Sequence, residues 1–291
     1  MEKGLYSPAE IAKELMETGC RKSSLPTYAL LILGMMAGAF IAFAAAGSNA
    51  AIHTIESVGI AKALAGALFT AGLMMVIIAG GELFTGNSLI IISCLEGRNK
   101  WMRLLRNWLW VYTGNFIGAL IIAFFVVKSG QLNFSAGALA GFTIKTAVYK
   151  TGLTFENAFF MGILCNWLVC LAVWMAAAAK DVAGKVLAIF FPIWLFVASG
   201  FEHSIANMYY IPVGILAKAN GDWVNAALSM GVTPEALEGL NWVSFVTRNL
   251  IPVTLGNILG GAFFVGGVYW LSYLYKGKKK ELSRKASKPS L

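Results

Sequence analysis

Charged residues are scarce in this chain. They make up 13% of its 291 residues, whereas about a quarter of the residues of a soluble domain are charged. The mean hydropathy of +0.70 agrees with this composition. No polar stretch is long enough to hold a separate soluble domain, so we expect one all-α membrane domain over residues 1–291.

The residues and motifs that most enzymes need are also missing. The chain has two histidines, and its four cysteines (Cys20, Cys94, Cys165 and Cys170) show no CxxC spacing. It contains no P-loop, dinucleotide-binding, GxSxG or HExxH motif. We therefore expect no metal, no cofactor and no enzymatic activity, and we interpret the cysteines as small buried hydrophobic residues.

The N-terminus lacks the apolar block of a secretory signal and carries charges instead. Ser7-Pro8-Ala9-Glu10 is a typical helix start, with a capping serine, a proline at the first helical position and a glutamate at the third. A weak apolar stripe follows. We expect residues 1–24 to form a short amphipathic helix on the cytoplasmic membrane surface.

Apolar segments fill residues 25–275 and predict six transmembrane helices, two of them broken. A crossing needs about 20 apolar residues. Four crossings are plain: Leu25–Gly47, Trp108–Val127, Ala158–Ala179 and Leu250–Leu274. The other two are Ala61–Gly80 with Ser88–Cys94, and Val186–Ser199 with Ile205–Ala217. In the first broken element we expect Gly86-Asn87 to stop the helix.

Lysine and arginine are unevenly distributed between the two predicted sides. Six crossings place both termini on one side, and that side carries most of the 23 basic residues, including the tail 276–291. The other side holds only Lys62, Lys128, Lys145, Lys150, Lys218 and Arg248. The positive-inside rule then places both termini in the cytoplasm of a cell membrane. Attraction to anionic lipid explains the basic tail better than binding to nucleic acid does.

The two halves of the chain resemble each other. Each break, at residues 80–87 and 199–207, has a glutamate five residues before an asparagine, and Tyr112–Gly118 matches Thr254–Gly260. Three crossings per half imply an inverted 3+3 repeat with a transport site near the bilayer midplane. Glycine pairs with GxxxG spacing indicate close helix packing; they are Gly34 with Gly38, Gly114 with Gly118, and Gly256 with Gly260.

Polar residues at the breaks are the candidates for acting on a solute. His203 could gain or donate a proton at cellular pH, and a structural histidine is the alternative. Glu82 and Glu202 have the same offset in both halves, which favours a structural role at helix ends over proton transfer. Thr85 and Asn207 could bind a small substrate or cap the half-helices.

Bulky apolar residues and lysines surround these candidates. The apolar residues could form constrictions that exclude hydrated ions, or ordinary core; they are Phe69, Leu73, Leu83, Phe84, Val169 and Phe196. Lys150, like Lys145, precedes the fourth crossing on the outer side. A cation there raises the local anion concentration, and a solvated loop lysine is the alternative interpretation.

At these residues the sequence resembles the formate/nitrite transporter family, from Ser7 to Trp270. The most specific matches are Gly81–Thr85, Cys165–Trp174, Val197–Met208 and Asn249–Asn257. The resemblance implies an aquaporin-like fold and a homopentamer with one pore per protomer. Tyr210–Gly214 and the insert to Trp242 are similar to the formate type, whereas Gly86-Asn87 departs from some formate channels. That departure leaves the gating of the loop open.

The resemblance also implies roles for individual residues. His203 corresponds to the family's central pore histidine, Thr85 to a threonine on a mobile loop, and Lys150 to a lysine of the outer vestibule. Asn257 corresponds to an asparagine close to the histidine. The six bulky apolar residues correspond to two constrictions in the pore.

Together these observations predict passive or proton-linked transport of small monovalent weak-acid anions, with formate first. We expect His203 to share a proton with the anion, because a near-neutral species crosses an apolar slit more easily than a bare charge. A nitrite or hydrosulfide channel is the alternative within the family. A water or glycerol channel would have paired Asn-Pro-Ala motifs, which are absent. A membrane scaffold or sensor that does not transport is the alternative from another class.

Overall fold

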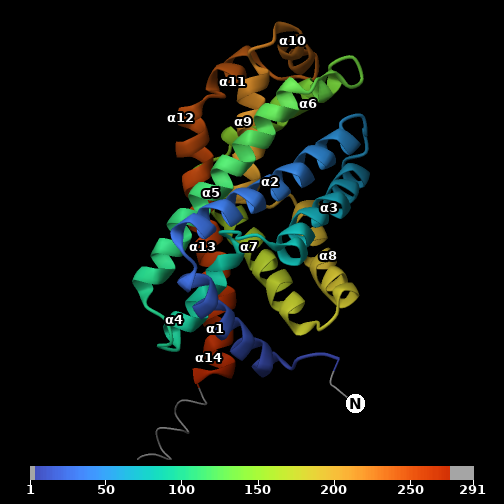
Figure 1. Ribbon diagram of the computed structural model, residues 1–291. Helices are drawn as coiled ribbons and strands as arrows, with labels where there is room; N and C mark the ends of the chain where they lie inside the picture. Colours follow the sequence, from blue (N-terminus) through green and yellow to red (C-terminus); the bar gives the residue numbers. More distant parts are fainter. Residues whose placement is uncertain (1–3, 276–291) are drawn as a thin grey trace, which may run out of the picture.

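The computed structural model describes residues 4–275 as an all-helical bundle (Figure 1). Within this range no strand forms, and only an isolated antiparallel bridge joins Leu5 and Ala179. The expected basic tail lies outside the described residues. In Figure 1, α1, α4 and α14 lie at one end of the molecule, and α6, α10 and α11 lie at the other. The prediction of an all-α protein rich in apolar helices is confirmed.

Between residues 4 and 275, five helical stretches are long and apolar enough to cross a membrane. They are α2 (Thr27–Ile52), α3 (Val58–Met74) continued by the π-helix Met75–Gly80, α5 (Trp101–Lys128), α7 (Phe155–Ala178), and Trp242–Tyr273. The last stretch consists of α12 (Trp242–Ser244), a π-helix (Phe245–Leu250), α13 (Ile251–Ile258), a second π-helix (Leu259–Gly267) and α14 (Val268–Tyr273).

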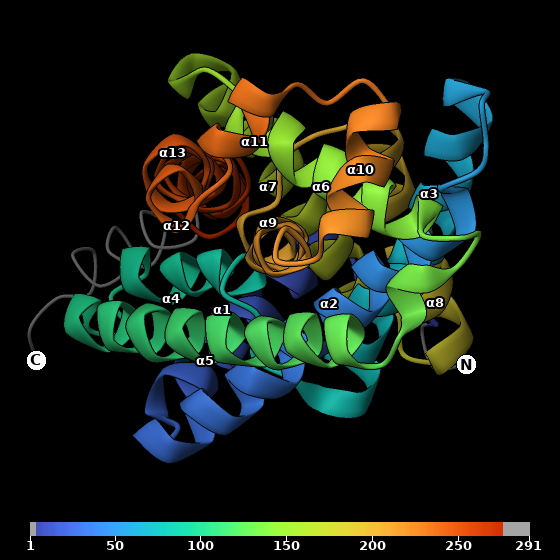
Figure 2. The same cartoon turned by 90° about the horizontal axis from the view of Figure 1, so that it is seen from above.

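Shorter helices complete the bundle. Three are apolar: Gly86–Leu95, which contains α4 (Ile91–Leu95), α8 (Val182–Ala198) and α9 (Ser204–Ala217). The others are α1 (Pro8–Ser24), the 3-10 turn Gln131–Asn133, α6 (Ala138–Thr151), α10 (Gly221–Ser229) and α11 (Pro234–Gly239). Seen from above, α9 stands end-on in the interior between α2, α5, α7 and α13 (Figure 2). The second break therefore lies deep in the protein.

The helix α1 begins as its sequence predicts. Ser7 and Glu10 form a reciprocal capping box, in which the Ser7 backbone N–H donates to the Glu10 carboxylate over 2.7 Å. Its apolar face, with Ile11 and Leu15, packs in one cluster with Leu89 and Trp174. The amphipathic helix is thus covered by protein on this face.

Two predicted loops are helical in the structure. The crossing predicted from Trp108 onward leaves Arg103 and Arg106 in the loop before it, but α5 already begins at Trp101. Apolar content underestimates this helix because its first turns carry Arg103 and Arg106, and the latter binds another segment. Arg106 donates to the Ser23 and Leu25 carbonyls at the end of α1. Lys150, expected just before a span, lies on α6, which is too short and too polar to be predicted as a crossing.

The position of the first helix stop was predicted wrongly. Gly86-Asn87 does not end a helix, because Gly86 begins the segment Gly86–Leu95. The helix ends instead at Gly80, whose φ of +98° is left-handed and suits glycine alone among common residues. Gly200, with φ +74°, ends α8 in the same way. Both breaks therefore open at a left-handed glycine.

The predicted small residues lie where helices approach most closely. A Cβ atom on Gly118 of α5 would lie 2.0 Å from the Met35 carbonyl oxygen of α2. A Cβ atom on Gly256 of α13 would lie 2.2 Å from the Phe159 carbonyl oxygen of α7. The α2–α5 and α7–α13 pairs thus pack backbone to backbone, which fixes the helices on which both breaks rest.

Candidate functional site

His203 and Thr85 join the two breaks. His203 is the N-cap of α9, and its Nδ1 accepts a hydrogen bond of 3.1 Å from the Ala206 backbone N–H. A backbone amide can only donate, so Nδ1 carries no proton in this arrangement. The neutral ring then carries its proton on Nε2, which donates to Thr85 Oγ1 at 2.9 Å. Both residues are buried; His203 is 3% exposed.

This geometry predicts the tautomer of His203. Labelling the histidines with ¹⁵N should give a His203 signal with a protonated Nε2 and an unprotonated Nδ1, because the Ala206 N–H occupies Nδ1. Solid-state NMR of the protein in lipid measures both nitrogens directly. Replacing His203 identifies its signal against that of His53. A His203 ring with its proton on Nδ1 would contradict the helix cap seen here.

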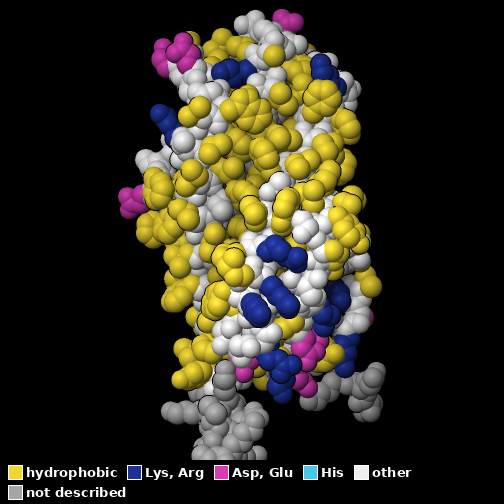
Figure 3. Space-filling view, turned by 60° about the vertical axis from the view of Figure 1, so that its left-hand side comes forward, with side chains coloured by type: hydrophobic (Ala, Val, Ile, Leu, Met, Phe, Trp, Pro, Cys, Tyr) yellow, Lys and Arg dark blue, Asp and Glu magenta, His cyan; other side chains and the backbone are white. Residues whose placement is uncertain are grey.

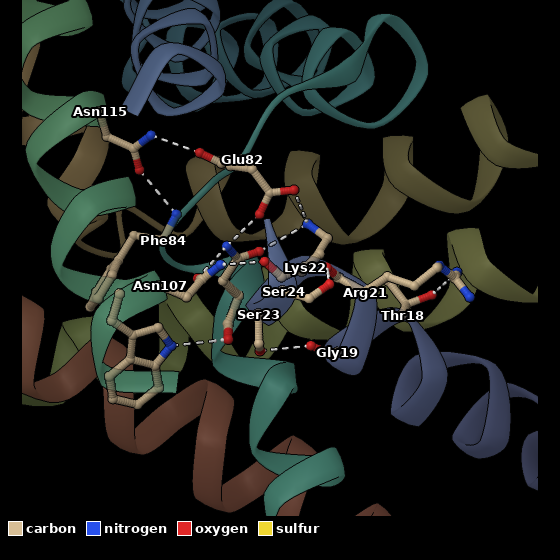
Figure 4. A network of polar contacts seen from close by, with 12 residues as sticks. Thr18, Gly19, Arg21, Lys22, Ser23, Ser24, Glu82, Phe84, Asn107 and Asn115 are labelled. Atoms are coloured by element: carbon tan, nitrogen blue, oxygen red, sulfur yellow. Dashed lines mark hydrogen bonds and ion pairs between the residues drawn. The ribbon is translucent and has the colours of Figure 1, made fainter. Parts of the chain in front are cut away.

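The first break is held by a buried cluster of polar side chains (Figure 4). Glu82 accepts a hydrogen bond of 2.7 Å from Asn87 Nδ2, and its other oxygen lies 3.2 Å from Lys22 Nζ. Asn87 also donates to Asn107 Oδ1 at 2.9 Å and accepts from Lys22 at 2.9 Å. The cluster ties α1, the break and α5 together.

The second break is held by a cluster of the same residue types. Glu202 accepts from Asn207 Nδ2 at 2.7 Å, and Lys150 Nζ donates to its other oxygen at 2.7 Å. Asn207 also donates to Asn249 Oδ1 at 2.7 Å. Asn249 donates in turn to the Lys150 carbonyl at 2.9 Å. Each half thus supplies one lysine, one glutamate and two asparagines in matching contacts.

A further asparagine braces the backbone at each break. Asn115 accepts from the Phe84 N–H at 3.0 Å and donates to the Glu82 carbonyl at 2.9 Å. Asn257 accepts from the Ser204 N–H at 2.9 Å and donates to the Glu202 carbonyl at 3.0 Å. These bonds satisfy backbone groups that the interrupted helices leave without a partner.

Two separate cavities end at the breaks. The α1-side cavity has a volume of about 640 Å³ and is lined by Leu73, Leu83, Glu82 and Lys22 among others. The α10-side cavity has a volume of about 770 Å³ and contains His203 in its wall. The two share no lining residue. The hydrogen-bonded residues Thr85 and His203 lie in the part of the protein between the two cavities.

The predicted apolar set divides between the two cavities. Leu73 and Leu83 line the α1-side cavity, and Phe69 and Phe196 line the α10-side cavity with an edge-to-face ring contact of 5.7 Å. Phe84 and Val169 line neither. Phe84 packs against Trp108 and Tyr112 instead. Four of the six predicted residues therefore line a cavity.

The remaining predicted residues take positions around the second break. Asn207 lines the α10-side cavity, but both of its donated hydrogen bonds go to protein. Lys150 also lines this cavity and is paired with Glu202. Asn257 lines neither cavity. Its contacts hold the backbone on either side of His203.

Three members of the polar clusters are not predicted as site residues from the sequence: Lys22, Asn107 and Asn249. Lys22 falls within residues 1–24, for which the sequence predicts only a helix on the membrane surface. Asn107 and Asn249 each stand eight residues before a bracing asparagine, Asn115 or Asn257. This repeated spacing is the signal in the sequence that identifies them. Among residues 4–275, no group of three His, Cys, Asp or Glu side chains gathers to hold a metal ion.

Buried polar breaks between two cavities, inside a bundle of apolar helices, define a membrane channel or transporter. Residues 9–271 match the model described as formate/nitrite transporter. The chain belongs to this family.

Its relatives cover nearly the whole chain. A probable formate transporter of Methanothermobacter thermautotrophicus is 40% identical over 94% of this chain and 99% of that protein. The formate channel FocA of Escherichia coli K12 is 39% identical over 93% and 95%, respectively. A solved pentameric formate channel with formate bound is 38% identical, covers 85% of this chain and 98% of that one, and superposes with a TM-score of 0.75.

Proposed function

We propose that this chain conducts formate across a cell membrane through one pore per protomer of a homopentamer. The observation that carries the proposal is the pair of buried breaks, joined by Thr85 and His203, between two cavities at opposite ends of the bundle. The names of the relatives supply the anion and the pentamer. The family is described as one of formate and nitrite transporters, which supports transport as the activity of this chain.

The matching clusters support an inverted 3+3 repeat of six crossings, with an aquaporin-like arrangement. Lys22 and Lys150, which belong to short helices before each half, hold equivalent glutamates at each break. Two-fold pseudosymmetry in the membrane plane places such breaks at mid-depth. Charged side chains gather mostly at the α1 end of the face in Figure 3, below a hydrophobic band. Both termini then lie in the cytoplasm.

In the proposed pathway formate enters a cavity, passes the apolar pairs and meets His203. A desolvated carboxylate costs several kcal/mol unless donors replace water. The Nε2–H of His203 and the Thr85 hydroxyl are the polar groups at this point. When Thr85 turns away, Nε2–H is free to share its proton with the anion in a hydrogen bond. Phe69, Phe196, Leu73 and Leu83 exclude larger hydrated ions.

Proteoliposomes test this function. Vesicles with the wild-type protein should take up ¹³C-formate much faster than empty vesicles. His203→Ala removes a hydrogen bond to a charged group, worth about 1.5–3 kcal/mol, so uptake should fall about tenfold or more. His203→Asn keeps an N-cap acceptor and an N–H donor and should retain more uptake. Equal uptake by His203→Ala at every pH would remove the histidine from the mechanism.

Competing anions and water separate the alternatives. If nitrite or hydrosulfide is the preferred anion, that anion should inhibit ¹³C-formate uptake at a lower concentration than unlabelled formate does. Rapid osmotic swelling without formate uptake would indicate a water channel. Wild-type vesicles that behave like empty ones in every assay would exclude transport, and a scaffold or sensor would then explain the membrane fold.

A further inference from the structure

The lysine expected to attract anions is already neutralised in this structure. Lys150 Nζ lies 2.7 Å from Glu202, and its side chain is only 12% exposed. The ammonium also lies over the Tyr210 ring, 5.2 Å from its centroid. A lysine so close to a carboxylate contributes little net charge to the cavity beside it. Another group must therefore supply positive potential at the α10-side cavity.

Lys62 is a cation of that cavity without a bound partner. It lies on α3, and its ammonium forms no hydrogen bond or ion pair with any residue in the range 4–275. Its Nζ lies against the second break, since a Cβ atom on Gly200 would be 3.2 Å from it. Among the described residues, the only other lysine or arginine side chains that line this cavity are Lys145, which donates to the Met230 carbonyl at 2.8 Å, and the paired Lys150.

Lys62 also stands on the face of α3 that leads to the predicted constriction. Lys62, Ala65 and Phe69 follow one another at helical spacing and all line the cavity. Seven residues of α-helix span about 10 Å. An anion held at Lys62 would thus be about two helical turns from the Phe69 ring and beside the break that carries His203.

A buried amide completes the arrangement. Asn49 on α2 lines the same cavity, is 5% exposed, and its Nδ2 has no hydrogen-bond partner within the described range. The preceding Ser48 donates to the Ala65 carbonyl at 3.1 Å, so this part of α2 packs against the Lys62 face of α3. A buried donor without an acceptor is unfavourable, and proteins retain few of them.

We propose that Lys62 and Asn49 form an anion-binding subsite in the α10-side cavity, where a small carboxylate waits before it reaches His203. One carboxylate oxygen pairs with the free ammonium. The Asn49 amide, whose Nδ2 is buried from solvent here, turns to donate to the other oxygen, which satisfies both groups. The proposal rests on the proposed transport function and assigns to Lys62 the recruiting role expected of Lys150.

Uptake kinetics test the subsite. We expect Lys62→Gln to raise the half-saturating formate concentration about three- to fivefold, the effect of one unit charge at about 5 Å in water. The maximal uptake rate should change by a smaller factor than the half-saturating formate concentration. Uptake by the wild type should weaken with added salt, and Lys62→Gln should lose most of this dependence. Lys62→Arg keeps the charge and should remain close to the wild type.

The matched control is Lys128→Gln. Lys128 is exposed and lies outside both cavities. Its substitution removes the same unit charge, so the variant should keep the wild-type half-saturating formate concentration and salt dependence. An equal effect of both substitutions would assign the change to overall surface charge and overturn the subsite. Wild-type kinetics in Lys62→Gln would overturn it too.

Asn49→Leu provides a test that does not depend on the lysine. It replaces an unpaired buried amide by an apolar group of similar size, so the variant should unfold at a higher temperature while its half-saturating concentration rises. A structural asparagine would give no rise in half-saturation. If Lys62→Gln fails to assemble, the half-saturating formate concentration of Asn49→Leu tests the subsite on its own. If the wild type conducts no anion at all, the proposed function fails first, and that result is distinct from altered kinetics.

Discussion

Glu202→Ala should destabilise the protein by about 3–5 kcal/mol, because it leaves the ammonium of Lys150 buried without a counter-charge. Glu202 also accepts hydrogen bonds from Asn207 and Asn249, so three partners lose an acceptor at once. The equivalent Glu82→Ala should cost less. Its partner Lys22 is 31% exposed, against 12% for Lys150, and lies 3.2 Å away rather than 2.7 Å.

Unfolding in an SDS titration measures both losses in the same assay. Glu82→Ala serves as the control for Glu202→Ala, because each substitution removes a glutamate side chain from an equivalent cluster. Lys150→Met in the Glu202→Ala background should recover part of the stability, since no unpaired charge is then buried. Equal losses at the two breaks would mean that burial of the lysine does not decide the cost.

The sequence predicts the helices well because a bilayer-like interior demands long apolar segments. Four plain elements and two interrupted ones correspond to helices of the structure, although α5 and the Trp242–Tyr273 stretch begin earlier than expected. These starts carry Arg103, Arg106 and Arg248, and hydropathy alone assigns such residues to loops. A charged residue need not lie in a loop when its side chain can bind backbone carbonyls of another helix, as Arg106 does.

The breaks themselves are predictable, but the groups that hold them are less so. Glycines, glutamates and asparagines at matching offsets mark both sites, and the structure brings Glu82 to Asn87 and Glu202 to Asn207. Which glycine takes the left-handed conformation depends on the packing beyond it, so Gly80 could not be chosen over Gly86. The lysine partners come from distant helices, and separation in sequence hides such contacts.

Charge alone also fails to identify the useful lysine. Lys62 and Lys150 are equivalent in a count of basic residues, and the resemblance to the family singles out Lys150. Three-dimensional contacts separate them, because Glu202 pairs with Lys150 while Lys62 faces the cavity unpaired. A residue's partner, which only the fold defines, determines whether its charge acts on a solute.

Gly38→Ala should prevent normal assembly of the channel, although it adds a single methyl group. The new Cβ atom would lie 2.1 Å from the Asn115 carbonyl oxygen and 2.7 Å from the Asn115 Cα, so α2 and α5 must move apart. Backbone atoms cannot rotate away as side chains do. We expect a cost at the upper end of the about 1–3 kcal/mol typical of overpacking, measured in the same SDS titration.

Gly47→Ala is the matched control on the same helix. Apart from the adjoining residues and backbone of its own helix, no atom of the described chain lies within 4 Å of a Cβ atom at Gly47. The methyl group is therefore accommodated, and alanine's higher helix propensity should add about 0.5–1 kcal/mol. Gly38→Ala should also slow formate uptake in any protein that does assemble. Asn115 braces the Phe84 N–H and the Glu82 carbonyl, and a shift of its backbone displaces the first break. Equal stability and uptake in the two variants would mean that α2 and α5 do not pack backbone to backbone.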